Sequence, residues 1–413
     1  MIRLRYLFVF AAALVLTAPP IASAQDTDTR AGQAEQQRAE KSKELEPYKP
    51  GKVERALLLV QERYLAQRFV NPPRGLFTRW GGMPEGQGFT VGPAYRFSNY
   101  DVSFTTTAAI SIIGAYEATG RLELPRPMLP PAKPASRFLS LGGLYHHLPR
   151  EDFYGFGQQS SRETHANFLL DEGTIDVTGG LSPAEWFTVS GIAEYRTERA
   201  GRGNDPRLPS IEVHHTGAAA PASQTDLDFV RLGGQTYFNY ADAPQRAPVG
   251  GRYLFSLNKY LDQTADQFSF NRWEVDLQQY IPVFTPSRLI ALRANAIGVI
   301  PDDGNDVPFY MQPTLGGSHT IRAYPHQRFR DRNAVVLQAE YRYILNDFMT
   351  GSVFYDTGKV AFDRKDLWDF DGMKNDYGIS VRFGFAGIAA LRAEIAWGGD
   401  EGTVYALRFS DVF

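Results

Sequence analysis

The residues of this chain that could perform catalysis or bind a metal are its histidines and carboxylates, because it has no cysteine. A histidine pair beside Asp or Glu could bind a metal, and a Ser–His pair could support ester hydrolysis. No spacing selects such a set, since G-x-S-x-G and H-E-x-x-H are both absent. We therefore expect no enzyme activity, no cofactor, no bound metal, and solvated loop histidines. The histidines lie at positions 146, 147, 165, 214, 215, 319 and 326.

The overall composition narrows the class of protein further. The chain has 413 residues, and its net charge of -3 argues against a nucleic-acid partner. Its length fits either two or three soluble domains or one large barrel. Beyond the N-terminal leader no run of eighteen apolar residues occurs, so we expect no membrane-spanning helix.

The N-terminal residues have the features of a secretory signal. Arg3 and Arg5 precede an apolar run over 7–16, and Ala-Ser-Ala at 22–24 forms a cleavage site. We predict a signal peptide over residues 1–24, and hence export from the cytoplasm.

Residues 25–74 are expected to lie in the periplasm. Residues 25–51 are almost entirely polar and cannot bury a core, which predicts a disordered segment. Apolar residues then recur at helical spacing until Asn71 and two prolines stop the pattern. We predict an amphipathic helix and linker over residues 52–74.

From Gly75 onward apolar residues alternate with polar ones. Near the C-terminus, for example, Leu391 and Ile395 share one face, whereas Arg392 and Glu394 share the other. A soluble sandwich also alternates, but through many short strands with a dry face and a wet one. Segments of about ten residues, with charges inside and aromatics near their ends, are typical of a transmembrane β-barrel. Such a sheet must close, because an open edge in lipid leaves backbone groups unpaired.

Counting these segments predicts a 16-stranded antiparallel transmembrane β-barrel over residues 75–413. The expected strands are 75–80, 88–97, 103–112, 115–124, 136–147, 164–178, 185–198, 227–240, 251–261, 267–280, 287–299, 333–344, 350–361, 376–385, 389–397 and 403–413. Most of the longest connections then fall on one side of the sheet: 148–163, 199–226, 300–332 and 362–375. Short turns such as Leu181-Ser182-Pro183 fall on the other, as in outer-membrane barrels. We expect residues 300–332 to occupy the lumen.

Several side chains on the polar faces are expected to be solvated charges of the lumen wall. They are Arg272, Glu274, Arg293, Arg382, Arg392, Glu394 and Arg408. The apolar face of the last strand carries Tyr405, Leu407, Phe409 and Phe413. A final strand that ends on Phe resembles the signal read by the outer-membrane assembly machinery.

Residues 308–358 carry motifs that together resemble one family. They include Pro-Phe-Tyr at 308–310, Leu-Gly-Gly at 315–317, Ile-Arg-Ala-Tyr at 321–324, a strand with Glu340, and Phe-Tyr-Asp-Thr-Gly at 354–358. Residues 152–157 add Asp-Phe-Tyr-Gly-Phe-Gly. Over residues 70–413 the set resembles the bacterial surface-antigen outer-membrane barrels of the BamA/TamA type. The loop motif comprises Gly316, Gly317, Ile321, Ala323 and Tyr324 around Arg322.

The resemblance implies a lumenal loop lock. In the family, the loop before the twelfth strand folds into the lumen and its arginine pairs with acids on the next two strands. The matching residues are Arg322, Glu340 and Asp356, and the alternation of both strands independently points the two acids inward. A guanidinium held by two carboxylates could pin the loop firmly, either to gate transport or only to brace it.

The function that the resemblance implies is insertion or translocation of proteins or lipids, through a weak seam between the first and last strands. Two features depart from the family: Ala323 stands where its members have Gly, and residues 25–74 have no room for its periplasmic POTRA repeats. A passive channel or structural barrel without assembly activity is the alternative, and an outer-membrane hydrolase is a third reading.

Location and partners follow from the same resemblance. We expect the protein to lie in the bacterial outer membrane and to contact its lipid. We also expect it to interact with the barrel-assembly machinery during biogenesis. An unfolded outer-membrane protein or a lipid is the expected substrate. A closed barrel needs no partner edge, which favours a monomer.

Overall fold

The computed structural model contains one antiparallel sheet of 16 strands. The residues that the structure describes are 72, 74–99, 101–125, 137–241, 248–346, 349–384 and 391–408. The expected signal peptide and polar segment, and nearly all of the expected helix over 52–74, lie outside them. Each strand pairs with the next along the chain, and β12 and β13 form a separate hairpin. The all-β fold and the strand count predicted from the sequence are therefore confirmed.

The strands and short helices have the following bounds. The sheet contains β1 (Gly75–Trp80), β2 (Thr90–Ser98), β3 (Ser103–Ser111), β4 (Tyr116–Leu124), β5 (Arg137–Phe153), β6 (Ala166–Ala184), β7 (Phe187–Arg202), β8 (Leu227–Asn239), β9 (Gly250–Asp262), β10 (Phe270–Val283), β11 (Thr285–Pro301), β14 (Asn333–Asn346), β15 (Met349–Ala361), β16 (Lys374–Phe383), β17 (Leu391–Gly398) and β18 (Gly402–Arg408). The hairpin is β12 (Thr314–Leu315) with β13 (Phe329–Arg330), and the helices are α5 (Ile211–His214), η1 (Gly217–Ala219), η2 (Phe309–Met311), η3 (Arg364–Trp368) and η4 (Gly399–Glu401). None of the helices in this part of the chain has the length and apolar character needed to cross a membrane.

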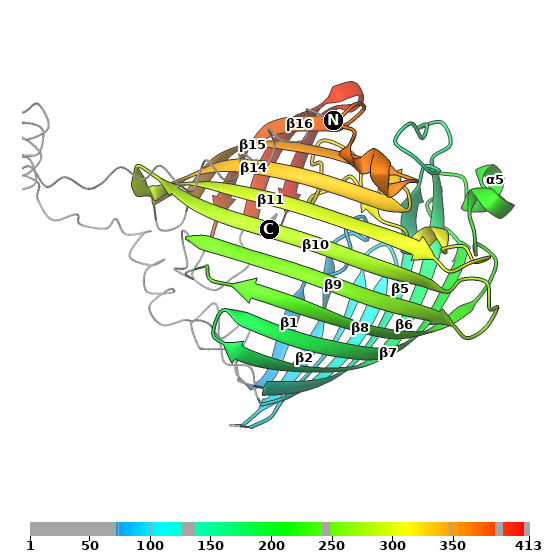
Figure 1. The fold of residues 1–413 in the computed structure, drawn as a ribbon, viewed down its shortest axis with the longest axis horizontal. Coiled ribbons are helices and arrows are strands. Elements are labelled where there is room, and N and C mark those ends of the chain that lie inside the picture. The colour runs from blue at the N-terminus through cyan, green and yellow to red at the C-terminus, as the bar shows by residue number, and fades with distance from the viewer. Residues whose placement is uncertain are drawn as a thin grey trace, which may run out of the picture. The chain divides into compact units, whose positions relative to one another are not determined.

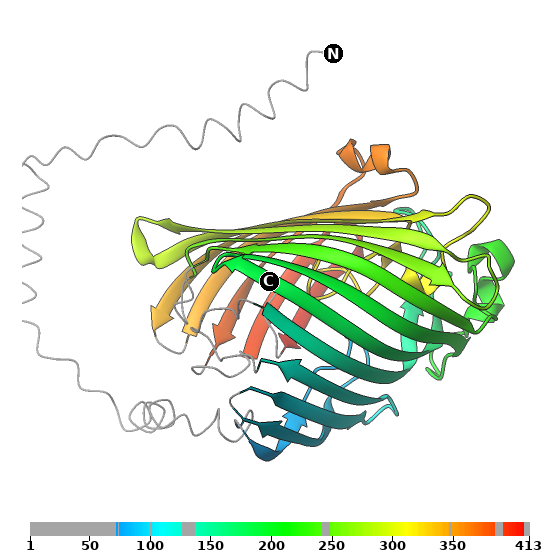
Figure 2. The same cartoon turned by 60° about the horizontal axis from the view of Figure 1, so that its bottom comes forward.

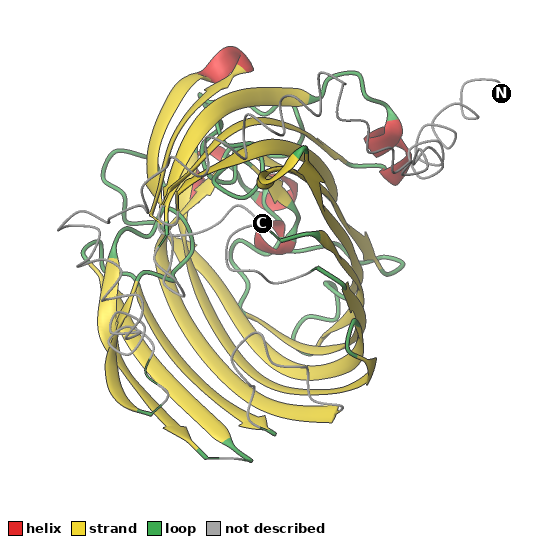
Figure 3. Cartoon of the chain, turned by 90° about the vertical axis from the view of Figure 1, so that its left-hand side faces the viewer, coloured by secondary structure: helices red, strands yellow, loops and turns green. Residues whose placement is uncertain are grey.

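The strands run side by side and the sheet curls round on itself (Figures 1 and 2). Viewed from one end, loops and short helices lie inside the curve of the sheet (Figure 3). Strand alternation explains what faces each way. In β16, Tyr377 and Ile379 are exposed on the outer face, whereas Asp376 and Ser380 are buried on the inner face. An apolar outer face and a polar inner face suit a barrel in lipid.

The connections confirm long loops at one end of the sheet, but one expected turn is wrong. Ser182 and Pro183 do not reverse the chain, because β6 continues to Ala184 and the turn follows at residues 185–186. The β6–β7 register shifts between Leu181 and Ala184. A bulge tolerates proline, which has no N–H for the ladder, so the strand passes through this position.

The two ends of the sheet are its shortest strands. β1 has 6 residues and β18 has 7, whereas β6 has 19. The described residues of β1 and β18 form no backbone ladder with each other, so the expected closure is not seen there. This edge would leave N–H and C=O groups available for another strand.

Candidate functional site

Two glycines set the backbone conformation of the loop between β11 and β14. Gly316 and Gly317 have φ values of +113° and +93°, which side chains rarely adopt. A Cβ on Gly316 would also lie 2.1 Å from the Pro325 carbonyl oxygen. Gly317 N–H donates to Tyr324 O at 3.0 Å and closes the turn around Arg322. The β12–β13 hairpin, which the sequence did not reveal, brackets this turn.

Apolar packing holds the same turn against the wall. Ile321 and Tyr324 belong to a buried cluster with Leu315 and Phe329 of the hairpin, completed by residues of β14 and β15. The wall members of this cluster are Ala334, Val336 and Val360. Because Ile321 and Tyr324 flank Arg322, their burial directs the guanidinium toward the inner face of the sheet.

Arg322 makes its main contact with Asp356 of β15. Its Nε lies 2.6 Å from Asp356 Oδ2 and its Nη2 lies 2.9 Å from Asp356 Oδ1, a bidentate pair. The Arg322 Cζ lies 3.3 Å from the centre of the Phe354 ring. Both charged side chains are 0% exposed. The structure therefore brings Arg322 and Asp356 together in a site screened from solvent.

Glu340 of β14 is the third residue of the expected lock, and it lies at the margin of the pair. Its Oε2 is 3.9 Å from Arg322 Nη1 and 3.2 Å from Arg342 Nη2. Its Oε1 is 3.8 Å from Arg382 Nη2. Glu340 is thus shared among three guanidinium groups and balances the buried positive charge.

A fourth residue, Asp376 of β16, was missed by the sequence analysis. Its Oδ2 accepts a hydrogen bond from Ala323 N at 2.9 Å, and its side chain is fully buried. The alternation that puts Ser380 and Arg382 on the inner face would have put Asp376 there too. What the sequence could not supply was the partner, because that partner is a backbone N–H of the loop.

Ala323, which stands where the resembling family has Gly, fits against the end of β17. A Cβ added to Gly398, the last residue of β17, would lie 2.6 Å from the Ala323 Cβ. The space that Ala323 occupies is therefore supplied by Gly398. Ala323 is itself 0% exposed, so any larger group at either position must displace the loop.

The charge on Arg322 survives its burial. Burial alone lowers the pKa of this guanidinium, but the carboxylates of Asp356 and Glu340 outweigh that effect and the pKa is raised. An Arg322 that stays charged binds Asp356 through charge-assisted hydrogen bonds. Removal of either partner would leave a buried charge unpaired.

Residues 224–410 match the Omp85 superfamily domain. The matched residues span the sheet from β8 to β18 and include the loop between β11 and β14. Among solved structures, BamA from Haemophilus ducreyi lacking POTRA domains 1-3 is 13% identical, with a TM-score of 0.58 over 85% of this chain and 76% of that chain. CdiB from Escherichia coli is 12% identical, with a TM-score of 0.51 over 81% of this chain and 60% of that chain. At these identities the likeness shows the fold, and no curated protein matches the chain.

The charged inner wall of the sheet is paired rather than solvated, contrary to expectation. Arg293 binds Asp276 at 2.6 Å and donates to His319 O of the loop at 3.0 Å. Arg272 likewise donates to Met311 O at 3.0 Å. These two wall arginines therefore also hold the loop. Each donates to a loop carbonyl that would otherwise accept a hydrogen bond from water.

Four of the histidines in the described residues are not simply solvated either. Ring nitrogens lie 2.5 to 2.8 Å from a carboxylate or carbonyl oxygen in four pairs: His146–Glu117, His147–Asp171, His165–Asp152 and His215–Thr164. Neighbouring strands supply two of these partners, Glu117 and Asp171, which local spacing in the sequence could not reveal. Of the expected C-terminal signal, Tyr405 and Leu407 are exposed on β18, and Phe409 and Phe413 lie outside the described residues.

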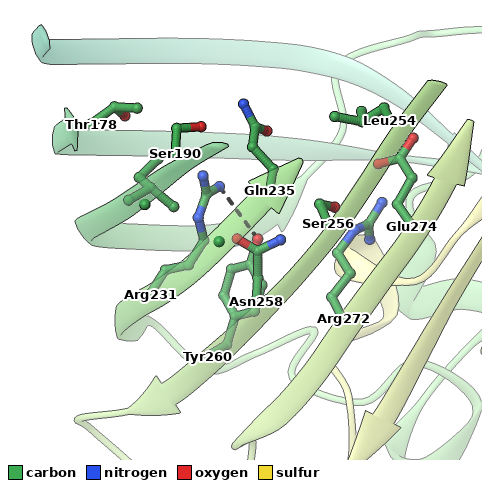
Figure 4. Close-up of a pocket in the computed structure, with 13 residues that line it drawn as sticks. Thr178, Ser190, Arg231, Gln235, Leu254, Ser256, Asn258, Tyr260, Arg272 and Glu274 are labelled. Carbon is green, nitrogen blue, oxygen red and sulfur yellow. Dashed lines mark hydrogen bonds between the residues drawn. The ribbon is translucent and has the colours of Figure 1, made fainter. Parts of the chain in front are cut away.

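Polar space remains beside the loop. A cavity of about 240 Å³ lies against the inner face of β6–β10, and Arg231, Asn258 and Arg272 are among the residues that line it (Figure 4). A second cavity of about 460 Å³ lies between this wall and Tyr310 and Arg330 of the loop. The loop therefore fills part of the lumen and leaves a polar chamber next to it.

Proposed function

We propose that this chain is an outer-membrane barrel that assists the insertion or translocation of other polypeptides or lipids. The Omp85 superfamily domain and the BamA-like and CdiB-like fold support an assembly- or translocation-type barrel in the bacterial outer membrane. As a consequence, the exposed apolar face would contact outer-membrane lipid, and the barrel-assembly machinery would fold this chain. A monomer suffices for the mechanism below.

The observation that carries the proposal is the weak junction between β1 and β18. Both strands are short, and their described residues share no backbone ladder. An unpaired edge is a template for an incoming strand, which would gain main-chain hydrogen bonds by pairing there. In our proposal a substrate strand pairs at this seam and enters the lipid sideways.

The loop lock would keep the lumen closed to solvent while the seam between β1 and β18 opens. The Arg322–Asp356 pair holds the loop against β15, on the part of the sheet that leads to β18. A loop pinned there blocks solvent flow through part of the lumen, and it also stiffens β14–β16. The seam could then open without the whole barrel leaking.

The test is an insertion assay with purified components. A urea-unfolded outer-membrane protein is added to liposomes that contain this barrel, and its folded form is followed by heat-modifiable migration. We expect faster folding than in empty liposomes, and a matched control variant, Asp371→Asn in an exposed loop, should behave as wild type. Folding at the empty-liposome rate would overturn the proposal.

A passive channel is the second candidate, and the polar cavities beside the loop favour it. Planar-bilayer conductance separates the two functions. If the loop plugs the lumen, the wild type should show small or flickering currents and Arg322→Ala should open wider. A large, steady conductance that is equal in both proteins would favour the channel.

A further inference from the structure

The connection between β1 and β2 folds inward and brings Glu85 onto the lumenal loop. Glu85 Oε2 accepts hydrogen bonds from Ser318 N at 2.7 Å and from Ser318 Oγ at 2.8 Å. Its other oxygen, Oε1, forms an ion pair with Arg408 Nη1. Glu85 therefore contacts the lumenal loop and the last strand, β18, with one carboxylate.

The same contacts continue into a closed circuit. Arg408 Nε donates to Glu394 Oε1 of β17 at 2.7 Å, and Glu394 Oε2 lies 2.9 Å from Arg392 Nε. Arg392 Nη2 donates to Ser318 O at 3.5 Å, which closes the ring of contacts. Because Ser318 also binds Glu85, the ring of contacts joins the β1–β2 connection, the loop, β17 and β18.

Neighbouring contacts fix the β1–β2 connection in place. Gln87 is 0% exposed, and its Nε2 donates to Arg150 O at 2.9 Å and to Glu151 Oε1 at 2.7 Å. Gln327 of the loop donates to the other oxygen of Glu151 at 2.6 Å. Glu85 is thus presented by a segment anchored at β5, and its position does not depend on Arg408 alone.

The surroundings keep Glu85 charged. Burial would raise its pKa, but Arg408 and the donors of Ser318 outweigh burial and lower the pKa to about 2. The side chains of Glu85 and Arg408 are 27% and 15% exposed, so solvent screens this pair less than a surface pair. The contact is therefore ionic at neutral pH.

We propose that Glu85, Ser318 and Arg408 form a seam latch, an autoinhibitory contact that ties the last strand to the β1–β2 connection. This inference rests on the proposed opening of the seam. The described residues of β1 and β18 form no backbone ladder with each other. A side-chain contact inside the lumen therefore joins β18 to the β1–β2 connection. Release of Glu85 from Arg408 frees β18 from the β1–β2 connection, and only the indirect contacts through Glu394 and Arg392 then join β18 to the loop. Loop movement and seam opening are thereby coupled.

The chain has no cysteine, so two introduced ones can carry spin labels without a background. Leu76→Cys on β1 and Thr403→Cys on β18 are both exposed positions. Distances between the labels would be measured by pulsed electron paramagnetic resonance in liposomes. Folding of every variant would first be checked by heat-modifiable migration.

We expect a narrow distance distribution in the latched barrel and a longer, broader one in Glu85→Gln and in Arg408→Gln. Glu85→Gln is isosteric and still accepts from Ser318, so it removes only the charge. The double variant should match either single variant, because both break one contact. The control Asp176→Asn breaks the Arg121 pair on β4–β6, away from the seam, and should match wild type.

Distributions that stay at the wild-type distance in both single variants would overturn the latch. Broadening that doubles in the double variant would overturn it as well, because the residues would then act independently. The insertion assay is a separate readout. If the latch variants move the labels while wild-type barrels fold substrate no faster than empty liposomes, the latch stands and the proposed function fails.

Discussion

Asp376 of β16 lies directly opposite Asp356 of β15 in the strand register, and both carboxylates are fully buried. Like charges in a directly opposed pair destabilise a sheet unless other groups compensate. Here Arg322 binds Asp356 in a bidentate manner, and the backbone N–H of Ala323 binds Asp376. One turn of the loop therefore supplies the donors for two buried acids on adjacent strands.

This pairing predicts opposite effects for two substitutions of Asp376. Asp376→Asn keeps an oxygen that accepts from Ala323 N and cannot ionise opposite Asp356, so stability should be unchanged or higher. Asp376→Ala leaves the Ala323 N–H buried without an acceptor and should cost about 1–3 kcal/mol. Urea unfolding of the refolded barrel measures both. Equal destabilisation by the two variants would contradict this account.

Arg322→Lys tests the geometry of the lock rather than its charge. Lysine cannot bind Asp356 through two parallel hydrogen bonds, and it stacks less well on Phe354. We expect a partial loss of unfolding free energy for Arg322→Lys. Arg322→Ala should lose about 3–5 kcal/mol, because buried carboxylates are left unpaired. A lysine variant as stable as wild type would show that charge alone suffices.

Gly398→Ala tests the fit between β17 and the loop. The new methyl group would lie 2.6 Å from the Ala323 Cβ, and overpacking of this kind costs about 1–3 kcal/mol. The double variant Gly398→Ala/Ala323→Gly moves the methyl group across the contact and should recover most of the loss. Urea unfolding of all three variants forms a double-mutant cycle. Additive effects would mean that the two positions do not share this space.

Acid should release the seam latch only at very low pH. The pKa of Glu85 in the folded barrel, about 2, lies below its ordinary value of 4.5. Its contribution is therefore complete above pH 4.5 and is lost as the pH falls toward 2. Spin-label distances in wild type should stay narrow down to about pH 3, whereas Glu85→Gln should be broad at every pH. Broadening centred near pH 4.5 in wild type would contradict the lowered pKa.

Sequence reasoning was most successful where one rule repeats along the chain. Alternation identified the all-β barrel fold and the sixteen strands, and it also pointed Glu340 and Asp356 inward. Resemblance supplied Arg322 as their partner. These inferences need only the period of a strand and a motif whose residues stay close in sequence.

Contacts between distant segments were beyond the sequence. Glu85 and Arg408 are separated by 323 positions, and only the closing curve of the sheet brings them together. Gly398 opposes Ala323 for the same reason, and no local pattern marks either pair. The bulge near Pro183 was misread as a turn, because proline and serine are common in turns but a bulge also tolerates them.

The most direct test of the central claim closes the seam covalently. A barrel with Leu76→Cys and Thr403→Cys would be joined across β1 and β18 by a cleavable bifunctional thiol reagent, then assayed for folding of an unfolded outer-membrane protein in liposomes. We predict that the cross-linked barrel folds substrate at the empty-liposome rate and that cleavage of the link restores the faster rate. Equal, accelerated folding with the seam closed and open would contradict insertion through this seam.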